Sequence, residues 1–91
     1  MLVLVQIDLS QAELALFDAY EAEVLPLLGK YGARLEERLR AEDGNSEVHL
    51  LYFPDDQALD AFRDDPSRVA LQDMWRRSGA VSTLTRVVRL A

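Results

Sequence analysis

The chain has 91 residues, of which 49% are hydrophobic and 29% are charged, and its formal net charge is −6. This length predicts one domain over residues 1–91 and excludes a multidomain enzyme with its own dinucleotide-binding fold. The absence of cysteine excludes disulfides and thiolate chemistry, and a single histidine argues against a His-rich metal site. Because no Gly-rich phosphate loop, Ser–His–Asp set or metal-ligand spacing is present either, we expect no cofactor and no metal.

The charge is unevenly distributed along the chain. Residues 1–65 carry 15 acidic and 5 basic side chains, whereas residues 66–91 carry 5 arginines and 1 aspartate. Nucleic-acid-binding proteins usually have a basic balance and a clustered patch, so we expect no nucleic-acid partner. No stretch reaches the roughly 20 apolar residues of a membrane helix, and the apolar start lacks the basic region of a signal peptide. We therefore expect no membrane partner and a cytoplasmic location.

A strand followed by an interrupted helix is expected in the first third of the chain. Residues 1–9 are rich in Val, Leu and Ile, which predicts a strand. Ser10 followed by Glu13 indicates a capping box at the start of a helix. The apolar residues of this helix recur at helical spacing, with the acidic residues, Glu21 included, mostly off the stripe: Leu14, Phe17, Val24, Leu28 and Tyr31. Pro26 lacks an amide N–H, so it should bend or split the helix before two glycines end it.

A hairpin is expected next. Residues 33–40 alternate, with Leu35 and Leu39 on one side and arginines on the other, which predicts an edge strand with solvated charges. A turn at residues 43–45 leads into a returning strand at residues 47–53.

The last part of the chain predicts a second helical segment and a final strand. Two aspartates after Pro54 should cap a short helix to about residue 64, and Pro66 should begin a further helix that ends near residues 78–79. Residues 81–90 are expected to form the last strand. The order βαββαβ with right-handed crossovers predicts an α+β, ferredoxin-like fold. In this fold a four-stranded antiparallel sheet carries both helical segments on one face.

Both faces of the expected sheet are apolar. In the first strand Val3 and Val5 lie on one face, and Leu2 and Leu4 lie on the other. The returning strand and the last strand repeat this pattern. Two helical segments cover only one face, and an apolar patch of this size rarely stays in contact with water. We therefore expect a homodimer in which the second face packs against a second copy.

Two runs of residues are similar to a known superfamily. They are Phe17-x-x-Tyr20-Glu21…Leu25-Pro26-Leu27-Leu28…Tyr31-Gly32-Ala33-Arg34-Leu35 and Leu51-Tyr52-Phe53-Pro54-Asp55…Ala58-Leu59-x-Ala61-Phe62…Asp65-Pro66. They resemble the first helix and its turn, and the third strand and second helix, of dimeric α/β-barrel proteins. The family that they resemble most is known as domain of unknown function 1330. The wider superfamily includes cofactor-independent monooxygenases, chlorite-dismutase-like haem enzymes and muconolactone isomerases, so the resemblance implies a dimeric barrel without fixing an activity.

Three residues are candidate acid–base groups. His49 titrates near neutrality without perturbation, and it alternates with Leu51, which favours a hydrogen-bonded histidine under the helices. A register shifted by one would instead place it in the barrel interior as an acid–base group. Asp8 and Tyr52 share the barrel side of neighbouring strands, where burial would raise the pKa of the carboxyl. The alternative places Asp8 in water at the end of its strand.

The expected ligand-binding residues are Gln6, Asp8, Tyr52, Trp75 and Arg86. Trp75 can stack on a ligand or belong to the core, and Arg86 can neutralise a ligand carboxylate or pair with an acid across the dimer. We hypothesise a homodimeric α/β barrel that binds a small apolar or aromatic molecule between sheet and helices. The alternatives are a cofactor-independent monooxygenase-like or isomerase-like enzyme using the acid–base candidates, or a structural or regulatory dimerisation module with a filled interior.

Overall fold

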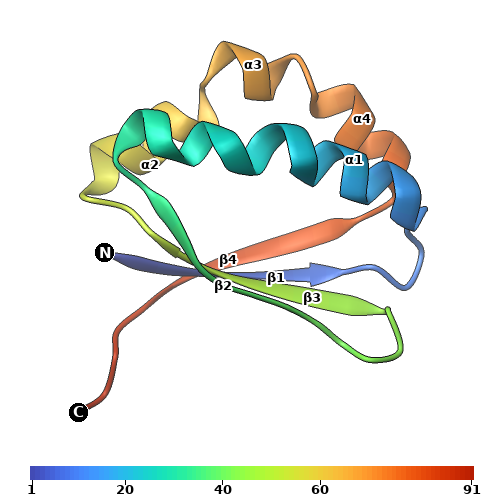
Figure 1. Cartoon of the computed structure of the whole chain (residues 1–91), viewed down its shortest axis with the longest axis horizontal. Coiled ribbons are helices and arrows are strands. Elements are labelled where there is room, and N and C mark those ends of the chain that lie inside the picture. The colour runs from blue at the N-terminus through green and yellow to red at the C-terminus, as the bar shows by residue number, and fades with distance from the viewer.

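Four strands form one antiparallel sheet, and every helical segment lies on the same side of it in the computed structural model, which describes all 91 residues (Figure 1). The strands occur in the order β2-β3-β1-β4 and have these bounds: β1 (Leu2–Asp8), β2 (Arg34–Arg40), β3 (Ser46–Tyr52) and β4 (Val81–Val87). The expected α+β, ferredoxin-like βαββαβ order is confirmed, and β2 is an edge strand as predicted. The last strand is shorter than expected, because it ends at Val87 rather than at residue 90.

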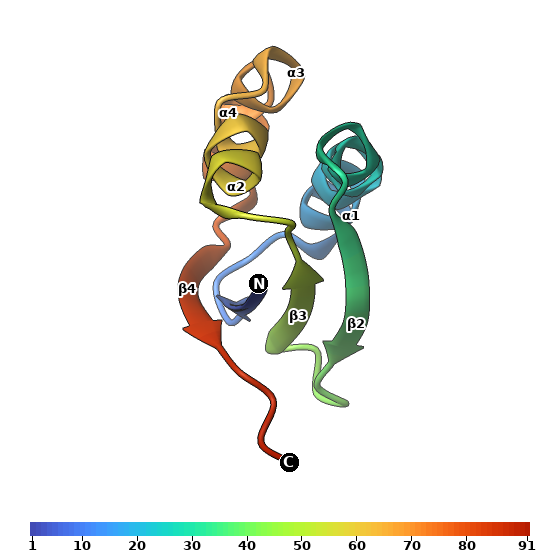
Figure 2. The ribbon, with the colours of Figure 1, turned by 90° about the vertical axis from the view of Figure 1, so that its left-hand side faces the viewer.

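The helical segments form two rows above the sheet (Figure 2). One row consists of α1 (Leu14–Val24) and the 3₁₀ helix η1 (Leu25–Tyr31). Pro26 marks the change between them, since it cannot donate to the α-helical ladder, and Gly32 ends the row with a φ of 67°. The other row consists of α2 (Asp56–Arg63), α3 (Pro66–Val69) and α4 (Gln72–Ser78).

Local contacts explain where the helices begin. The predicted capping box at Ser10 is wrong, because Glu13 is the N-cap residue of α1 and no side chain caps this end. Instead, the Glu13 amide donates to the Ser78 carbonyl at 2.7 Å, which ties the start of α1 to the end of α4. The cap predicted for α2 is present, because Asp55 accepts from the Ala58 amide. Pro66 begins α3 as predicted, and Asp65 before it caps this helix.

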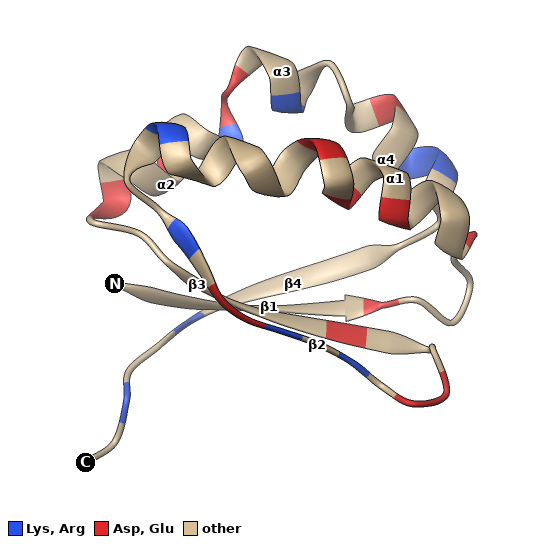
Figure 3. Ribbon diagram, viewed as in Figure 1, with Lys and Arg blue, Asp and Glu red and all other residues tan.

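A β-bulge changes the facing of β2. Leu35 pairs with Leu51 and Glu37 pairs with Leu50, so Glu36 is an extra residue between two paired positions. The arginines beyond the bulge therefore turn toward the helices, and Leu39 turns away from them. The prediction that Leu35 and Leu39 share a face is wrong, because the alternation was counted without an inserted residue. Charged residues of both signs follow one another along β2 (Figure 3).

The face of the sheet under the helices, here called the covered face, carries the core. Its buried residues include Val3 and Ile7 of β1 and Leu51 of β3. The core forms two clusters, one with Tyr20, Val24 and Phe62 at its centre and a smaller one around Ile7 and Phe17. Val5 and Trp75 pack against both clusters, so they stand at the boundary between them.

The opposite face, here called the open face, has no helix against it. The strand register places eight apolar side chains on it: Leu2, Leu4, Leu39, Val48, Leu50, Tyr52, Val81 and Val87. Leu39 and Val81 are more than half exposed in the single chain. The expectation that both faces are apolar is thus correct for the strand positions. No helix of the chain has the length and apolar character needed to span a bilayer.

Candidate functional site

A partly enclosed cavity of about 310 Å³ lies between the covered face and the helices, at the boundary between the two core clusters. This volume is at the lower end of the range for small-molecule sites, roughly 300–1,000 Å³. Its apolar and aromatic lining comes from both layers: Val5, Ile7, Tyr20, Val24, Leu25, Leu28, Leu51, Phe62 and Trp75. Its polar lining is smaller: Glu21, His49, Arg68, Gln72 and Ser82.

One side of the cavity is aromatic. The Trp75 ring lies 5.1 Å from the Tyr20 ring and 6.2 Å from the Phe17 ring, measured between centroids, with tilted planes. Two aromatic residues of α1 therefore pack against the indole of α4, which fixes its orientation at the cavity. A flat apolar ligand would find a rigid stacking surface here.

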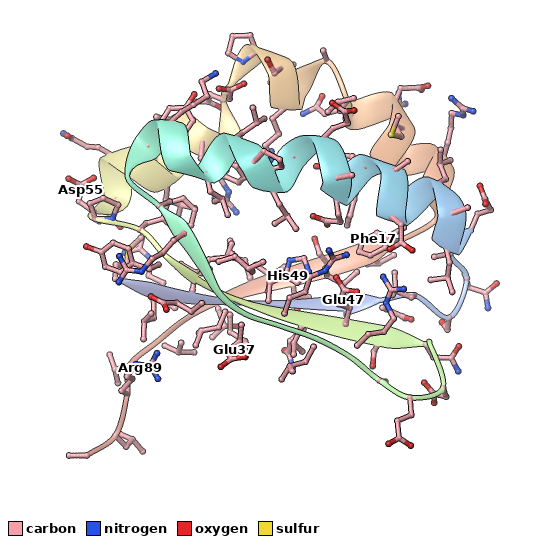
Figure 4. All side chains as sticks on the ribbon, viewed as in Figure 1. Phe17, Glu37, Glu47, His49, Asp55 and Arg89 are labelled. Carbon is pink, nitrogen blue, oxygen red and sulfur yellow. The ribbon has the colours of Figure 1, made fainter.

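A charged network connects the cavity to the edge of the sheet. The His49 Nε2 lies 2.5 Å from the Glu47 Oε2, and the Nε atoms of Arg38 and Arg40 donate to the same carboxylate at 2.9 and 2.8 Å. Figure 4 shows Glu47 and His49 between the sheet and the helices. Arg40 also pairs with Asp18 of α1 at 2.5 Å. The bulge in β2 makes this network possible, because it turns both arginines toward the covered face.

The network keeps Glu47 charged and His49 neutral. Burial raises the pKa of Glu47, but hydrogen bonds from His49, Arg38 and Arg40 outweigh it and hold the pKa below its ordinary value. Burial lowers the pKa of His49, and the bond to Glu47 opposes this only in part. Neutral His49 therefore donates its Nε2 proton to Glu47, which leaves Nδ1 as its acceptor.

Glu21 is the second ionisable group of the cavity. It is only 5% exposed, and burial raises its pKa to about 7, against partial opposition from the charges of Arg38 and Arg68. No hydrogen bond contributes to this shift. Near neutral pH the carboxyl can therefore either hold or accept a proton, which suits binding of a polar ligand group as well as acid–base chemistry.

Arg68 of α3 is the third ionisable group that lines the cavity. Its Nη1 donates to the Arg63 carbonyl at 3.2 Å, and its guanidinium carbon lies 5.4 Å from the centroid of the Phe62 ring. Its Nε is buried and has no hydrogen-bond partner in the protein, the one side-chain nitrogen or oxygen of which this is true. Since buried donors without a partner are costly, this atom is available for a ligand acceptor.

Three of the expected site residues lie outside the cavity. Gln6, Asp8 and Tyr52 are on the open face, which is the barrel side on which the sequence placed them, so they do not line the sheet–helix cavity and their role in binding stays a prediction. Asp8 is exposed at the end of β1, where the Ser10 amide donates to its carboxylate and lowers its pKa rather than raising it. Arg34 stacks on the Tyr52 ring, with its guanidinium carbon 4.2 Å from the centroid.

Of the other expected residues, two line the cavity and one does not. Trp75 and His49 line the cavity, and His49 faces the helices as its alternation with Leu51 indicated. Arg86 pairs with Asp56 at the start of α2, with Nη2 2.5 Å from Oδ1, and does not line the cavity. The acid that it meets thus belongs to its own chain.

Sequence reasoning missed Glu21 and Arg68. Glu21 was placed off the apolar stripe of α1, yet it is four residues after Phe17 and three before Val24, which puts it on the buried side. An acidic residue in step with that stripe was therefore a usable signal. Arg68 gave none, because its position depends on how α3 is set between α2 and α4.

No cluster of three or more His, Cys, Asp or Glu side chains in the chain could hold a metal ion. No family model and no curated protein matches the chain, so the resemblance to domain of unknown function 1330 stays a prediction.

Solved structures share the fold over nearly the whole chain. SnoaB from Streptomyces nogalater is described as a cofactor-independent oxygenase and is 17% identical to this chain. The match covers 98% of this chain and 94% of SnoaB, with a TM-score of 0.73. A dimeric ferredoxin-like protein of unknown function from Jannaschia sp. CCS1 is 17% identical. The match covers 96% of this chain and 100% of that protein, with a TM-score of 0.66. An uncharacterised NIPSNAP domain protein from Burkholderia xenovorans is 22% identical. The match covers 100% of this chain and 98% of that protein, with a TM-score of 0.62. These likenesses establish the ferredoxin-like fold.

Proposed function

We propose that this protein is a homodimer whose subunits each bind a small apolar or aromatic molecule in the cavity between the sheet and the helices. The observation that carries the proposal is the cavity itself, with the tilted rings of Trp75 and Tyr20 at one side and a few polar groups among apolar ones. A purely structural module would fill this space with side chains, so the cavity counts against that alternative. The cytoplasmic location expected from the sequence stays a prediction.

The open face supports the dimer. Burying apolar side chains of this size contributes roughly 1.5–3 kcal/mol each before the cost of association is subtracted. One solved structure with this fold is described as dimeric. The simplest partner for a face without a helix is the same face of a second copy, which closes the two sheets into a barrel.

Ligand binding can be tested at Trp75, the only tryptophan of the chain. Naphthalenemethanol, a neutral flat probe, should shift the NMR resonance of the Trp75 indole N–H in a saturable way. Val5→Phe should fill the cavity and abolish the shift, whereas Val88→Phe, on the exposed segment after β4, should leave it unchanged. Circular dichroism checks that both variants fold. No saturable shift in the parent protein, or an equal shift in Val5→Phe, would contradict the proposal.

A second candidate function is acid–base catalysis on a bound ketone or phenol. Glu21, with a pKa of about 7, lines the same cavity as neutral His49, so a proton acceptor and a hydrogen-bonding partner are both in place. This candidate corresponds to the isomerase-like alternative, with Glu21 in the role that the sequence gave to Asp8.

Deuterium exchange tests this second function. The protein should accelerate exchange of the α-protons of a tetralone in deuterated buffer, followed by NMR. Glu21→Gln should abolish the acceleration, and Glu23→Gln, an exposed change on the same helix, should not. Exchange at the buffer rate with the parent protein would exclude this activity for enolisable aromatic ketones.

A further inference from the structure

The cavity places a cation and a carboxyl group near each other without a direct bond between them. Arg68 and Glu21 both line it, and the charge of Arg68 acts on both Glu21 and its neighbour Tyr20. Hydrogen bonds hold neither the Glu21 carboxylate nor the Arg68 Nε within the protein. Two polar groups that face one cavity in this way leave room for a ligand group that contacts both.

The free side of the Arg68 guanidinium indicates what that group is. Nη1 is engaged by the Arg63 carbonyl, so Nε and Nη2 remain on the side that matches the two oxygens of a carboxylate. Arg68 is also held in place, because Phe62 lies under its guanidinium and the Asp65 carboxylate accepts its backbone N–H at 3.3 Å. A fixed guanidinium with an unused fork is suited to a carboxylate.

Glu21 determines when such a ligand can enter. An ionised Glu21 would repel a ligand carboxylate in this buried space, whereas a protonated Glu21 can donate its O–H to it. We infer that the cavity binds a small aromatic carboxylate, with Arg68 as its anchor and Glu21 taking up a proton as the ligand binds. This inference rests on the proposed binding function and names the ligand class.

The charged groups around Glu21 do not compete as proton acceptors near neutral pH. Asp18 on the same helix and Glu47 on β3 have pKa values below the ordinary range. Arg38 on β2 and Arg68 on α3 stay charged, and burial keeps His49 on β3 neutral. Tyr20 has a raised pKa, and the remaining polar lining from β4 and α4, Ser82 and Gln72, does not titrate. Glu21 is therefore the group that couples binding to pH here.

Calorimetry with naphthoate and neutral naphthalenemethanol tests the inference. Naphthoate should bind about tenfold more tightly at about pH 6 than at about pH 8, since one proton with a pKa near 7 is taken up, while the neutral probe should show no such dependence. At about pH 8, buffers of different ionisation enthalpy should report uptake of about one proton per naphthoate. In Glu21→Gln the pH dependence of naphthoate binding should disappear.

The anchor is tested separately. Arg68→Gln should weaken naphthoate by about tenfold or more, as expected for a lost charge-assisted bond, and leave naphthalenemethanol within about twofold. Arg76→Gln, an exposed arginine of α4, is the matched control and should change neither.

Equal naphthoate binding in Arg68→Gln, or pH-independent binding by the parent protein, would overturn the inference. If Arg68→Gln does not fold, the proton uptake and Glu21→Gln decide the matter. Failure of both probes would overturn the proposed function as well, whereas binding of the neutral probe alone would overturn only the carboxylate.

Discussion

In an isolated monomer, the face of the sheet under the helices would be apolar and the face in water would be polar. Both faces of this sheet depart from that pattern. The covered face contains the polar groups Glu47 and His49 under the helices, whereas the open face presents Leu4 and Leu50 where a monomer would have polar side chains. This difference favours the proposal that both faces are interfaces. The covered face combines a core with the cavity that we propose to bind a ligand, and the open face carries the apolar side chains that we propose to bury in the dimer.

The largest expected effect comes from a charge on the open face. Leu4→Lys should convert the dimer to a monomer, because a lysine would have to be buried between the two sheets. Light scattering at micromolar concentration should then fall from about twice 10.3 kDa to 10.3 kDa. Ala61→Lys, an exposed change on α2, should leave the dimer intact. A parent protein that is already a monomer would refute the association, and loss of the fold in Leu4→Lys would place Leu4 in the core of the single subunit.

The next largest effect is on the free energy of unfolding, and two neighbouring leucines that lie on opposite faces of the sheet should change it differently. Leu51 is buried on the covered face, whereas Leu50 is partly buried on the open face. Leu51→Ala should lower the free energy of unfolding by about 2–5 kcal/mol at any protein concentration. Leu50→Ala should weaken the dimer instead, so its effect on urea unfolding should grow with dilution. The same concentration dependence in both variants would show that the faces are not distinct in this way.

The smallest expected effect is the pH dependence from Glu21. Its pKa is about 7 in the folded chain against 4.5 for an unperturbed glutamate, so the folded state binds more protons between these values. The resulting stabilisation is complete below pH 4.5 and is lost as the pH rises through about 7, by up to about 3 kcal/mol. Urea unfolding between about pH 5 and pH 8 should show this loss in the parent protein and in Glu23→Gln, but not in Glu21→Gln. Parallel profiles for all three proteins would contradict the buried position of Glu21.

Periodicity was enough to predict most of the fold. Alternation located the strands, Pro26 marked the split of the first helical row, and Asp55 and Pro66 marked the starts of helices, because each of these signals is local. The covered face was also assigned correctly from Val3 and Leu51. The capping box at Ser10 failed since the chain makes a turn before α1, where the Glu13 amide bonds to α4 instead.

The site was less accessible from sequence. His49 and Trp75 were named, and both line the cavity. Asp8 and Tyr52 were assigned to the cavity because the barrel interior was taken as the binding space, whereas the cavity lies on the other face. Arg68 depends on tertiary packing of a four-residue helix, and no local pattern records that.

The single extra residue in β2 has a consequence for how related sequences should be aligned. If the present residues of β2 paired without the bulge, strict alternation would send the arginines beyond Glu36 to the open face and leave the Glu47 carboxylate without its guanidinium partners. A homologue with one codon fewer at this point would pair regularly without a bulge, and its residues at the positions of Arg38 and Arg40 would still face an acid at the position of Glu47. An alignment of such a relative should therefore place its gap at Glu36, which brings the arginines and the acid of the polar interior into common columns.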